Sequence, residues 1–171
     1  MIIQLKIAFV NSKIKSDAAI NGGDNIAVEA QDWSDIADAI GWKNKIGVKL
    51  NSFSLDLKSN IRLRVYFEVT SGTIDDYTVK INGVTVTPEE LDGVYCVDYA
   101  VYARNLNKSV TVSITDSEGG ELYLETSPLY YAKIMVDKYD GENAEAYKNL
   151  MNAIKRYSDT AIAYANEIKG G

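Results

Sequence analysis

The sequence contains no histidine, and this absence removes a large part of enzyme chemistry. Catalytic triads built on imidazole, histidine metal ligands and a histidine pH switch are all excluded. The chain also has a single cysteine, Cys96, so it can form neither an internal disulfide nor a thiolate metal cage. Since the remaining residue types do not specify a reaction, we predict that the chain is not an enzyme and binds no cofactor.

Long apolar runs and an excess of basic charge are also missing. No stretch approaches the roughly 18 apolar residues that a membrane-spanning helix needs, and the alternating residues 1–10 are typical of a strand, not of a secretory signal. Lys and Arg number 18 against 24 Asp and Glu, a net charge of −6. Because nucleic acids and anionic membranes bind basic surfaces, we predict no nucleic-acid partner and no membrane insertion.

The sequence does contain many short segments in which apolar and polar residues alternate. The clearest is 61–69, and Asn82-Gly83 between two other segments is the strongest short-range hairpin signal in the chain, because both positions tolerate positive φ. Short strands separated by turn signals at this spacing predict an antiparallel β-sandwich. We expect strands near 3–9, 26–30, 53–57, 61–69, 77–81, 84–86, 94–101, 110–115 and 122–124.

After Ser127 the hydrophobic period becomes helical. Ser127 and Pro128 suit the N-cap and first position of a helix that runs to about Val136. Residues 143–168 then predict a long helix, whose apolar stripe should pack on the sheet because an isolated helix is marginally stable. The stripe consists of Tyr147, Leu150, Met151, Ile154, Tyr157, Ala161, Tyr164, Ala165 and Ile168. A further short helix is expected at 35–40, between Ser34 and Gly41.

The predicted fold is mostly β with α, an antiparallel immunoglobulin-like β-sandwich packed by a long C-terminal helix. At 171 residues the chain has the length of one domain. Residues 46–126 form the sandwich and residues 127–171 the C-terminal helices. Residues 1–45 supply a strand and the short helix, and either complete the sandwich or form a separate lobe.

From about Val48 onward, the chain resembles an uncharacterised accessory module of large secreted and surface proteins of gut and rumen Clostridia. The similarity rests on the alternating segment 60–67, the hairpin segment 77–83, the tail segment 127–132 and the helical run 150–165. In that run Ser158 stands where the module usually has glycine, and Ala165 where it usually has phenylalanine. Such modules often accompany glycoside hydrolase or dockerin regions, so the resemblance implies a non-catalytic part of an exported protein.

Aromatic residues are the best candidates for a binding site. Sandwich modules that bind glycans stack sugar rings on exposed aromatic faces, and Trp and Tyr combine such a face with a polar group. We select Trp33 and Trp42, together with Tyr66 and the neighbouring Arg64 on the polar side of the predicted strand 61–69. The alternative is that both tryptophans pack the short helix onto the sandwich.

Acidic residues precede the long helix and offer an alternative chemistry. Calcium prefers oxygen ligands of this type, but the spacing does not match a twelve-residue calcium loop, and the helix dipole explains acids at a helix N-terminus. We therefore predict no metal site. The residues concerned are Asp137, Asp140, Glu142 and Glu145.

These observations predict a non-catalytic binding or interaction module that is extracellular or at the cell surface as part of a larger exported bacterial protein. The chain itself shows no signal peptide. A plant polysaccharide is the leading ligand, and a protein partner is the other kind of ligand considered. The alternative is a purely structural subunit or spacer, of a surface assembly, an adhesin repeat or a virion, with no small-molecule ligand.

Overall fold

The structure is a computed structural model that describes residues 29–36, 41–44, 46–57 and 60–169. The strand expected at 3–9, most of the strand expected at 26–30 and most of the helix expected at 35–40 lie outside these residues. Within them the elements are β1 (Gly41–Asn44), β2 (Val48–Leu57), β3 (Ile61–Val69), η1 (Ile74–Asp76), β4 (Thr78–Ile81), β5 (Val84–Thr85), β6 (Glu89–Leu91), β7 (Val94–Ala100), η2 (Ala103–Asn105), β8 (Val110–Thr115), β9 (Glu121–Thr126), α2 (Pro128–Lys138) and α3 (Ala144–Lys169).

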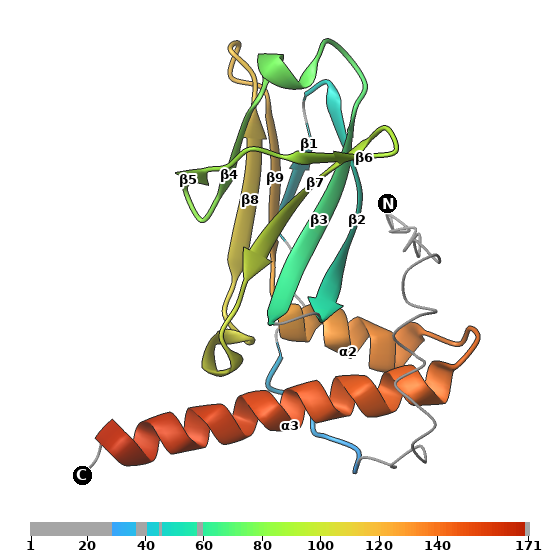
Figure 1. Cartoon of the computed structure of the whole chain (residues 1–171), viewed down its shortest axis with the longest axis vertical. Helices are drawn as coiled ribbons and strands as arrows, with labels where there is room; N and C mark the ends of the chain where they lie inside the picture. Colours follow the sequence, from blue (N-terminus) through green and yellow to red (C-terminus); the bar gives the residue numbers. More distant parts are fainter. Residues whose placement is uncertain (1–28, 37–40, 45, 58–59, 170–171) are drawn as a thin grey trace.

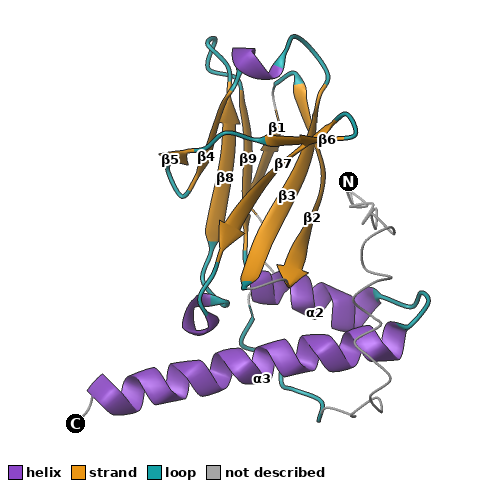
Figure 2. Cartoon of the chain, viewed as in Figure 1, coloured by secondary structure: helices purple, strands orange, loops and turns teal. Residues whose placement is uncertain are grey.

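The strands form two antiparallel sheets. One has the order β1-β9-β8-β4-β5 and the other the order β2-β3-β7-β6. Both sheets stand on the same side of the two C-terminal helices (Figures 1 and 2). The prediction of a mostly β protein with a long C-terminal helix is therefore confirmed at this level. Strand β1 was not predicted; its residues follow the segment expected to be helical and pair with β9.

Alternation in the sequence corresponds to alternation in burial. In β3 the side chains of Leu63, Val65 and Phe67 are buried, whereas Arg64 and Tyr66 between them are partly exposed. Successive side chains of a strand point to opposite faces, so every second residue enters the core. The same pattern holds in β8 and β9, which the sequence also predicted.

The Asn82-Gly83 hairpin forms as predicted between β4 and β5. Asn82 has a φ of 49° and Gly83 a φ of 80°, the left-handed values that a tight two-residue hairpin turn requires. The Asn82 carboxamide Oδ1 also accepts a hydrogen bond of 2.9 Å from the backbone N–H of Thr111 in β8. The turn residue thus fastens the hairpin to its neighbouring strand.

Helix α2 begins where the sequence predicted. The Ser127 hydroxyl accepts a 3.0 Å hydrogen bond from the Tyr130 backbone N–H, and Pro128 occupies the first helical position. The helix lies between the strand ends and α3 (Figure 1). Its Tyr131 ring meets the Phe53 ring of β2 edge-on at a centroid distance of 5.8 Å. Helix α2 therefore contacts the strands directly.

The prediction that the whole apolar stripe of the long helix packs on the sheet was wrong. Helix α3 packs on α2 and η2, and its Ser158 hydroxyl donates a 2.9 Å hydrogen bond to the Ala103 carbonyl. Met151 and Ile154 are buried, but other stripe residues are exposed. The buried face of α3 is centred on Met151, Lys155 and Ser158, so it overlaps only one edge of the stripe. At its C-terminal end α3 also extends beyond the strands (Figure 1). The exposed members are Leu150, Tyr157, Tyr164 and Ile168.

Buried side chains of both sheets and both helices belong to one hydrophobic cluster. It includes Phe67 of one sheet, Leu124 of the other, Met135 of α2 and Met151 of α3. Burial of this apolar surface is the main force that holds the elements together. Trp33 and Ile36, from the segment before β1, join the same cluster.

Candidate functional site

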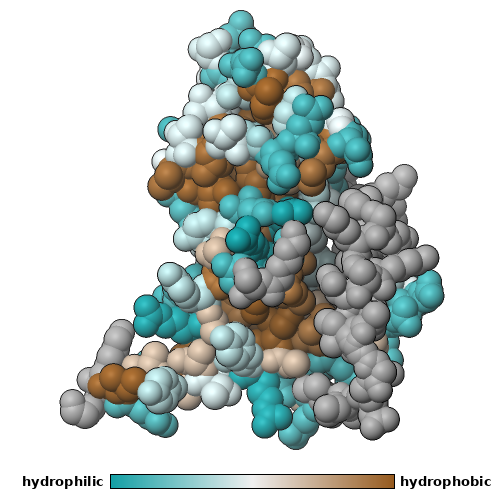
Figure 3. All heavy atoms as spheres, viewed as in Figure 1, coloured by the Kyte–Doolittle hydropathy of each residue, from teal (hydrophilic) through white to brown (hydrophobic). Residues whose placement is uncertain are grey.

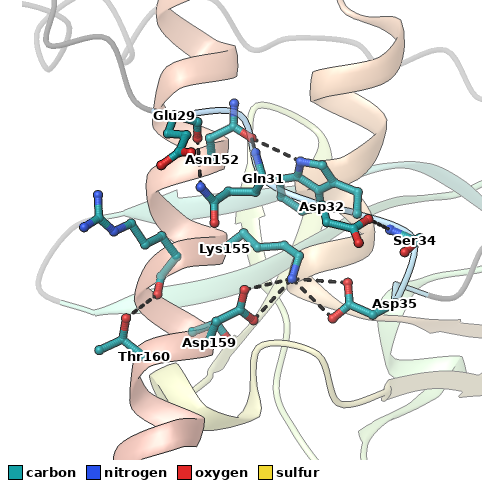
Figure 4. Close-up of polar contacts among 12 residues, drawn as sticks. Glu29, Gln31, Asp32, Ser34, Asp35, Asn152, Lys155, Asp159 and Thr160 are labelled. Atoms are coloured by element: carbon teal, nitrogen blue, oxygen red, sulfur yellow. Dashed lines mark hydrogen bonds and ion pairs between the residues drawn. The ribbon is translucent and has the colours of Figure 1, made fainter.

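Trp33 is an internal packing residue in this structure. Its side chain is 8% exposed, and its indole Nε1 donates a 3.1 Å hydrogen bond to Asn152 Oδ1 of α3. The same oxygen accepts a 3.2 Å hydrogen bond from the backbone N–H of Gln31. The ring therefore has no exposed face on which a sugar could stack, and it fastens residues 31–33 to the helix (Figure 4).

A buried lysine completes this contact. The Lys155 ammonium lies 3.2 Å from an Asp35 oxygen and 2.9 Å from an Asp159 oxygen, and 5.9 Å from the centre of a Trp33 ring (Figure 4). Burial alone would lower the pKa of Lys155, but the hydrogen bonds and charges of the two carboxylates outweigh it, so the pKa is raised. The cation thus stays charged and binds the segment before β1 to α3.

Arg64 and Tyr66 lie on β3, whereas Trp33 contacts α3. The Arg64 guanidinium donates two hydrogen bonds to Asp98, of 2.5 and 2.6 Å, and lies 3.4 Å from Asp56. The hydrogen bond to Asp98 is the main cause of its raised pKa. Two carboxylates therefore already engage this guanidinium. Tyr66, opposite Ser52 and Cys96 in the sheet, is half-buried.

Trp42 stands opposite Leu124 in the pairing of β1 with β9, and its side chain lies outside the described residues. Among the four residues selected from the sequence, the structure brings together Arg64 and Tyr66 on one strand. It places Trp33 elsewhere, against α3.

A small polar pocket was missed by the sequence analysis. It has a volume of about 120 Å³ and lies where the segment 35–36, the loop 107–109 and the junction of β9 with α2 meet. Thr126 is buried there, and its Oγ1 has no hydrogen-bond partner among the residues that the structure describes. Hydroxyl, amide and carboxylate groups of this kind can bind the hydroxyls of a polar ligand. The lining residues are Asp35, Ile36, Asn107, Ser109, Thr126, Ser127 and Tyr130.

The larger feature is an exposed apolar face along α3. Leu150 is 40% exposed, Tyr157 59%, Tyr164 65% and Ile168 62%. Hydrophobic surface is visible on the part of α3 that extends beyond the strands (Figure 3). The sequence carried the signal for this face, namely the long apolar stripe, but could not show that only part of the stripe is covered.

The acidic side chains before the long helix and the single cysteine were the other candidates for chemistry. Among the described residues there is no group of three acidic or cysteine side chains that could hold a metal ion, and Asp137, Asp140 and Glu142 are exposed. The Asp76 carboxylate accepts a 2.8 Å hydrogen bond from the Thr73 backbone N–H, a capping contact. Cys96 is buried, and burial raises the pKa of its thiol, which lowers its reactivity.

No helix within the described ranges has both the length and the apolar composition to cross a bilayer. In comparisons with known protein families, with curated proteins and with solved structures, nothing matched this chain.

Proposed function

We propose that this chain is a non-catalytic interaction module that binds a protein partner through the exposed face of α3. The observation that carries the proposal is the row formed by Leu150, Tyr157 and Tyr164, spaced seven residues apart on one side of the helix, with Ile168 continuing it. A row of exposed apolar side chains on one helix face is typical of interaction sites, whereas single scattered ones are normal on any protein surface.

The type of residue also favours a protein contact. Tyrosine is enriched in interfaces because it combines large apolar area with a polar group and loses little conformational entropy. Tyr157 and Tyr164 are both more than half exposed, whereas the indole of Trp33, the residue best suited to a sugar platform, is buried. A helix anchored at one end and projecting at the other presents such residues without disturbing the core.

The rest of the proposal concerns the architecture and its setting. We infer that the two sheets face each other as an immunoglobulin-like sandwich, which the shared hydrophobic cluster supports. We further propose that the chain is part of a larger exported bacterial protein and serves at the cell surface or outside the cell. Support for this setting comes from the resemblance carried by segments such as 60–67 and 77–83.

Photo-crosslinking tests the proposed surface directly. A photoreactive phenylalanine analogue at position 164 should form an adduct with a protein partner, whereas the same analogue at Asn166, which is also exposed on α3, should form none. An adduct that appears equally at both positions, or at neither, contradicts the proposal.

A polysaccharide is a second candidate ligand, and the polar pocket is the observation that favours it. Thr126 Oγ1 lacks a partner within residues 29–36, 41–44, 46–57 and 60–169, and Asp35 and Asn107 line the same pocket. Affinity electrophoresis against plant polysaccharides should show retardation that Asn107→Ala removes and that Asn166→Ala, on α3, leaves intact. The same assay with Trp42→Ala, Tyr66→Ala and Arg64→Ala tests the residues selected from the sequence. If no polysaccharide retards the protein, this candidate is excluded.

A further inference from the structure

The apolar face of α3 follows a seven-residue repeat. Its members alternate at steps of three and four along nearly the whole helix, the spacing of the a and d positions in coiled coils. In a coiled coil such a row is covered by the matching row of another helix. The members are Tyr147, Leu150, Ile154, Tyr157, Ala161, Tyr164 and Ile168.

The chain itself covers one edge of this repeat and leaves the other edge open. Ile154 is buried, and the Tyr147 ring meets the Tyr139 ring at 5.2 Å. In contrast Leu150, Tyr157 and Tyr164, which form every second member, are exposed. Helix α2 and η2 therefore occupy one side of the repeat, and a further helix would complete the other.

We propose that this further helix is α3 of a second copy of the same chain, paired antiparallel to the first. The inference rests on the proposed function, since it names the partner of the same surface. A helix with a seven-residue repeat is complementary to itself, and a twofold axis lets each copy present the same patch to the other.

The area of the face is sufficient for a modest dimer. Aromatic side chains of this size bury up to about 250 Å² each, so complete burial of the exposed parts of Leu150, Tyr157, Tyr164 and Ile168 would cover roughly 500 Å² on each copy. Twice that area reaches about 1,000 Å², the lower end for a specific interface. The residues beside the row include Ala146, Ala153 and Thr160, whose small side chains let a second helix approach closely.

The order of large and small residues favours the antiparallel arrangement. Centred near Asp159, an antiparallel pair places Leu150 opposite Ile168 of the second copy and Tyr157 opposite its Ala161. In a parallel pair each residue faces itself, so Tyr157 would meet Tyr157 while Ala161 would meet Ala161. Near the centre of the antiparallel pair a large residue thus lies opposite a small one, whereas two copies of Tyr157 would meet in the parallel pair, and packing large against small fills an interface more evenly.

Disulfide trapping tests both the partner and the direction. Leu150→Cys and Ile168→Cys are prepared as separate variants with Cys96→Ser in both, mixed under mild oxidation and compared with each variant alone. We expect a disulfide-linked pair in the mixture and little product from either variant alone. Ala163→Cys mixed with Ile168→Cys is the control, because Ala163 is exposed on another face of α3 and should give no product.

Three other outcomes overturn the inference. Product from Leu150→Cys alone indicates a parallel pair, and equal product from the control indicates random collision. No product from any mixture indicates that a second copy does not cover α3. In that case an adduct of another protein with the photoreactive analogue at position 164 would leave the proposed function standing, and the absence of any adduct would remove both.

Discussion

The carboxamide oxygen of Asn152 in α3 accepts a 3.1 Å hydrogen bond from the indole N–H of Trp33, a residue 119 positions earlier in the chain. Both side chains are buried. Because the same oxygen also binds the backbone N–H of Gln31, one side chain holds the segment before β1 against the C-terminal helix. The anchored half of α3 thus depends on residues from both ends of the described chain.

Replacing Asn152 tests this anchor. Asn152→Leu leaves the Trp33 indole N–H and the Gln31 N–H without an acceptor, which should lower the free energy of unfolding by about 2–4 kcal/mol. Asn166→Leu makes the same change at an exposed position of α3 and should change it by less than about 0.5 kcal/mol. Urea unfolding followed by circular dichroism measures both. Equal effects would show that the shared acceptor does not stabilise the fold.

Lys155 should make stability depend on alkaline pH. Its pKa is raised in the folded protein, so the folded state holds this proton more tightly than the unfolded state does. The stabilisation is fully present below the ordinary lysine pKa and is lost as the pH rises through the raised value. Tyr131, whose pKa burial raises to about 12, contributes a loss in the same direction.

The difference between wild type and Lys155→Met isolates the lysine. At neutral pH we expect the free energy of unfolding of Lys155→Met to differ from that of wild type by no more than about 1 kcal/mol, because Asp35 and Asp159 are exposed enough to regain water. As the pH rises from neutral to above the lysine pKa, the melting temperature of wild type should fall more steeply than that of the variant. Parallel curves would mean that Asp35 and Asp159 do not hold the lysine charged.

Thr126 offers a test of the polar pocket. Its buried Oγ1 has no hydrogen-bond partner in the described part of the chain, so Thr126→Val, a change of similar shape, should leave stability unchanged or raise it. Thr111→Val is the control, since Thr111 Oγ1 contacts Asn82 Oδ1 at 3.4 Å on the exposed side of β8. If calorimetric melting shows that Thr126→Val lowers the free energy of unfolding by more than about 1 kcal/mol, the Thr126 hydroxyl of wild type has a bound partner.

Ser158 fixes how α3 sits on η2. The residue is fully buried and bonds the Ala103 carbonyl, so Ser158→Leu should overpack this contact and cost about 1–3 kcal/mol. Tyr157→Leu, at the adjacent and largely exposed position, should leave the fold intact. A melting temperature that falls equally in both variants would contradict the assigned directions of these two side chains.

The strands and their turns could be predicted because their signals are local. Alternation at 61–69 and the Asn82-Gly83 pair each act within a few residues, and the structure confirms both. The start of α2 was predictable for the same reason, since Ser127 bonds a backbone N–H three residues on.

The binding surface was less predictable, because it depends on contacts between distant segments. An apolar stripe on 143–168 predicts a buried face, but only the position of α2 and η2 decides where the cover ends. The burial of Trp33 likewise depends on Asn152, over a hundred residues away. The polar pocket joins three separate segments, and no short pattern marks Thr126 as one of its buried groups.

Sedimentation equilibrium tests the central claim most directly, that the exposed face of α3 is a protein-contact surface formed between two copies. Wild type should shift from one-chain to two-chain mass as the concentration rises towards roughly 100 µM, as expected for a small interface. Tyr157→Asp combined with Tyr164→Asp should remain at one-chain mass with an unchanged melting curve, while Ala163→Asp should behave like wild type. A wild-type protein that keeps one-chain mass throughout, or a double variant that associates as strongly as wild type, would contradict the account.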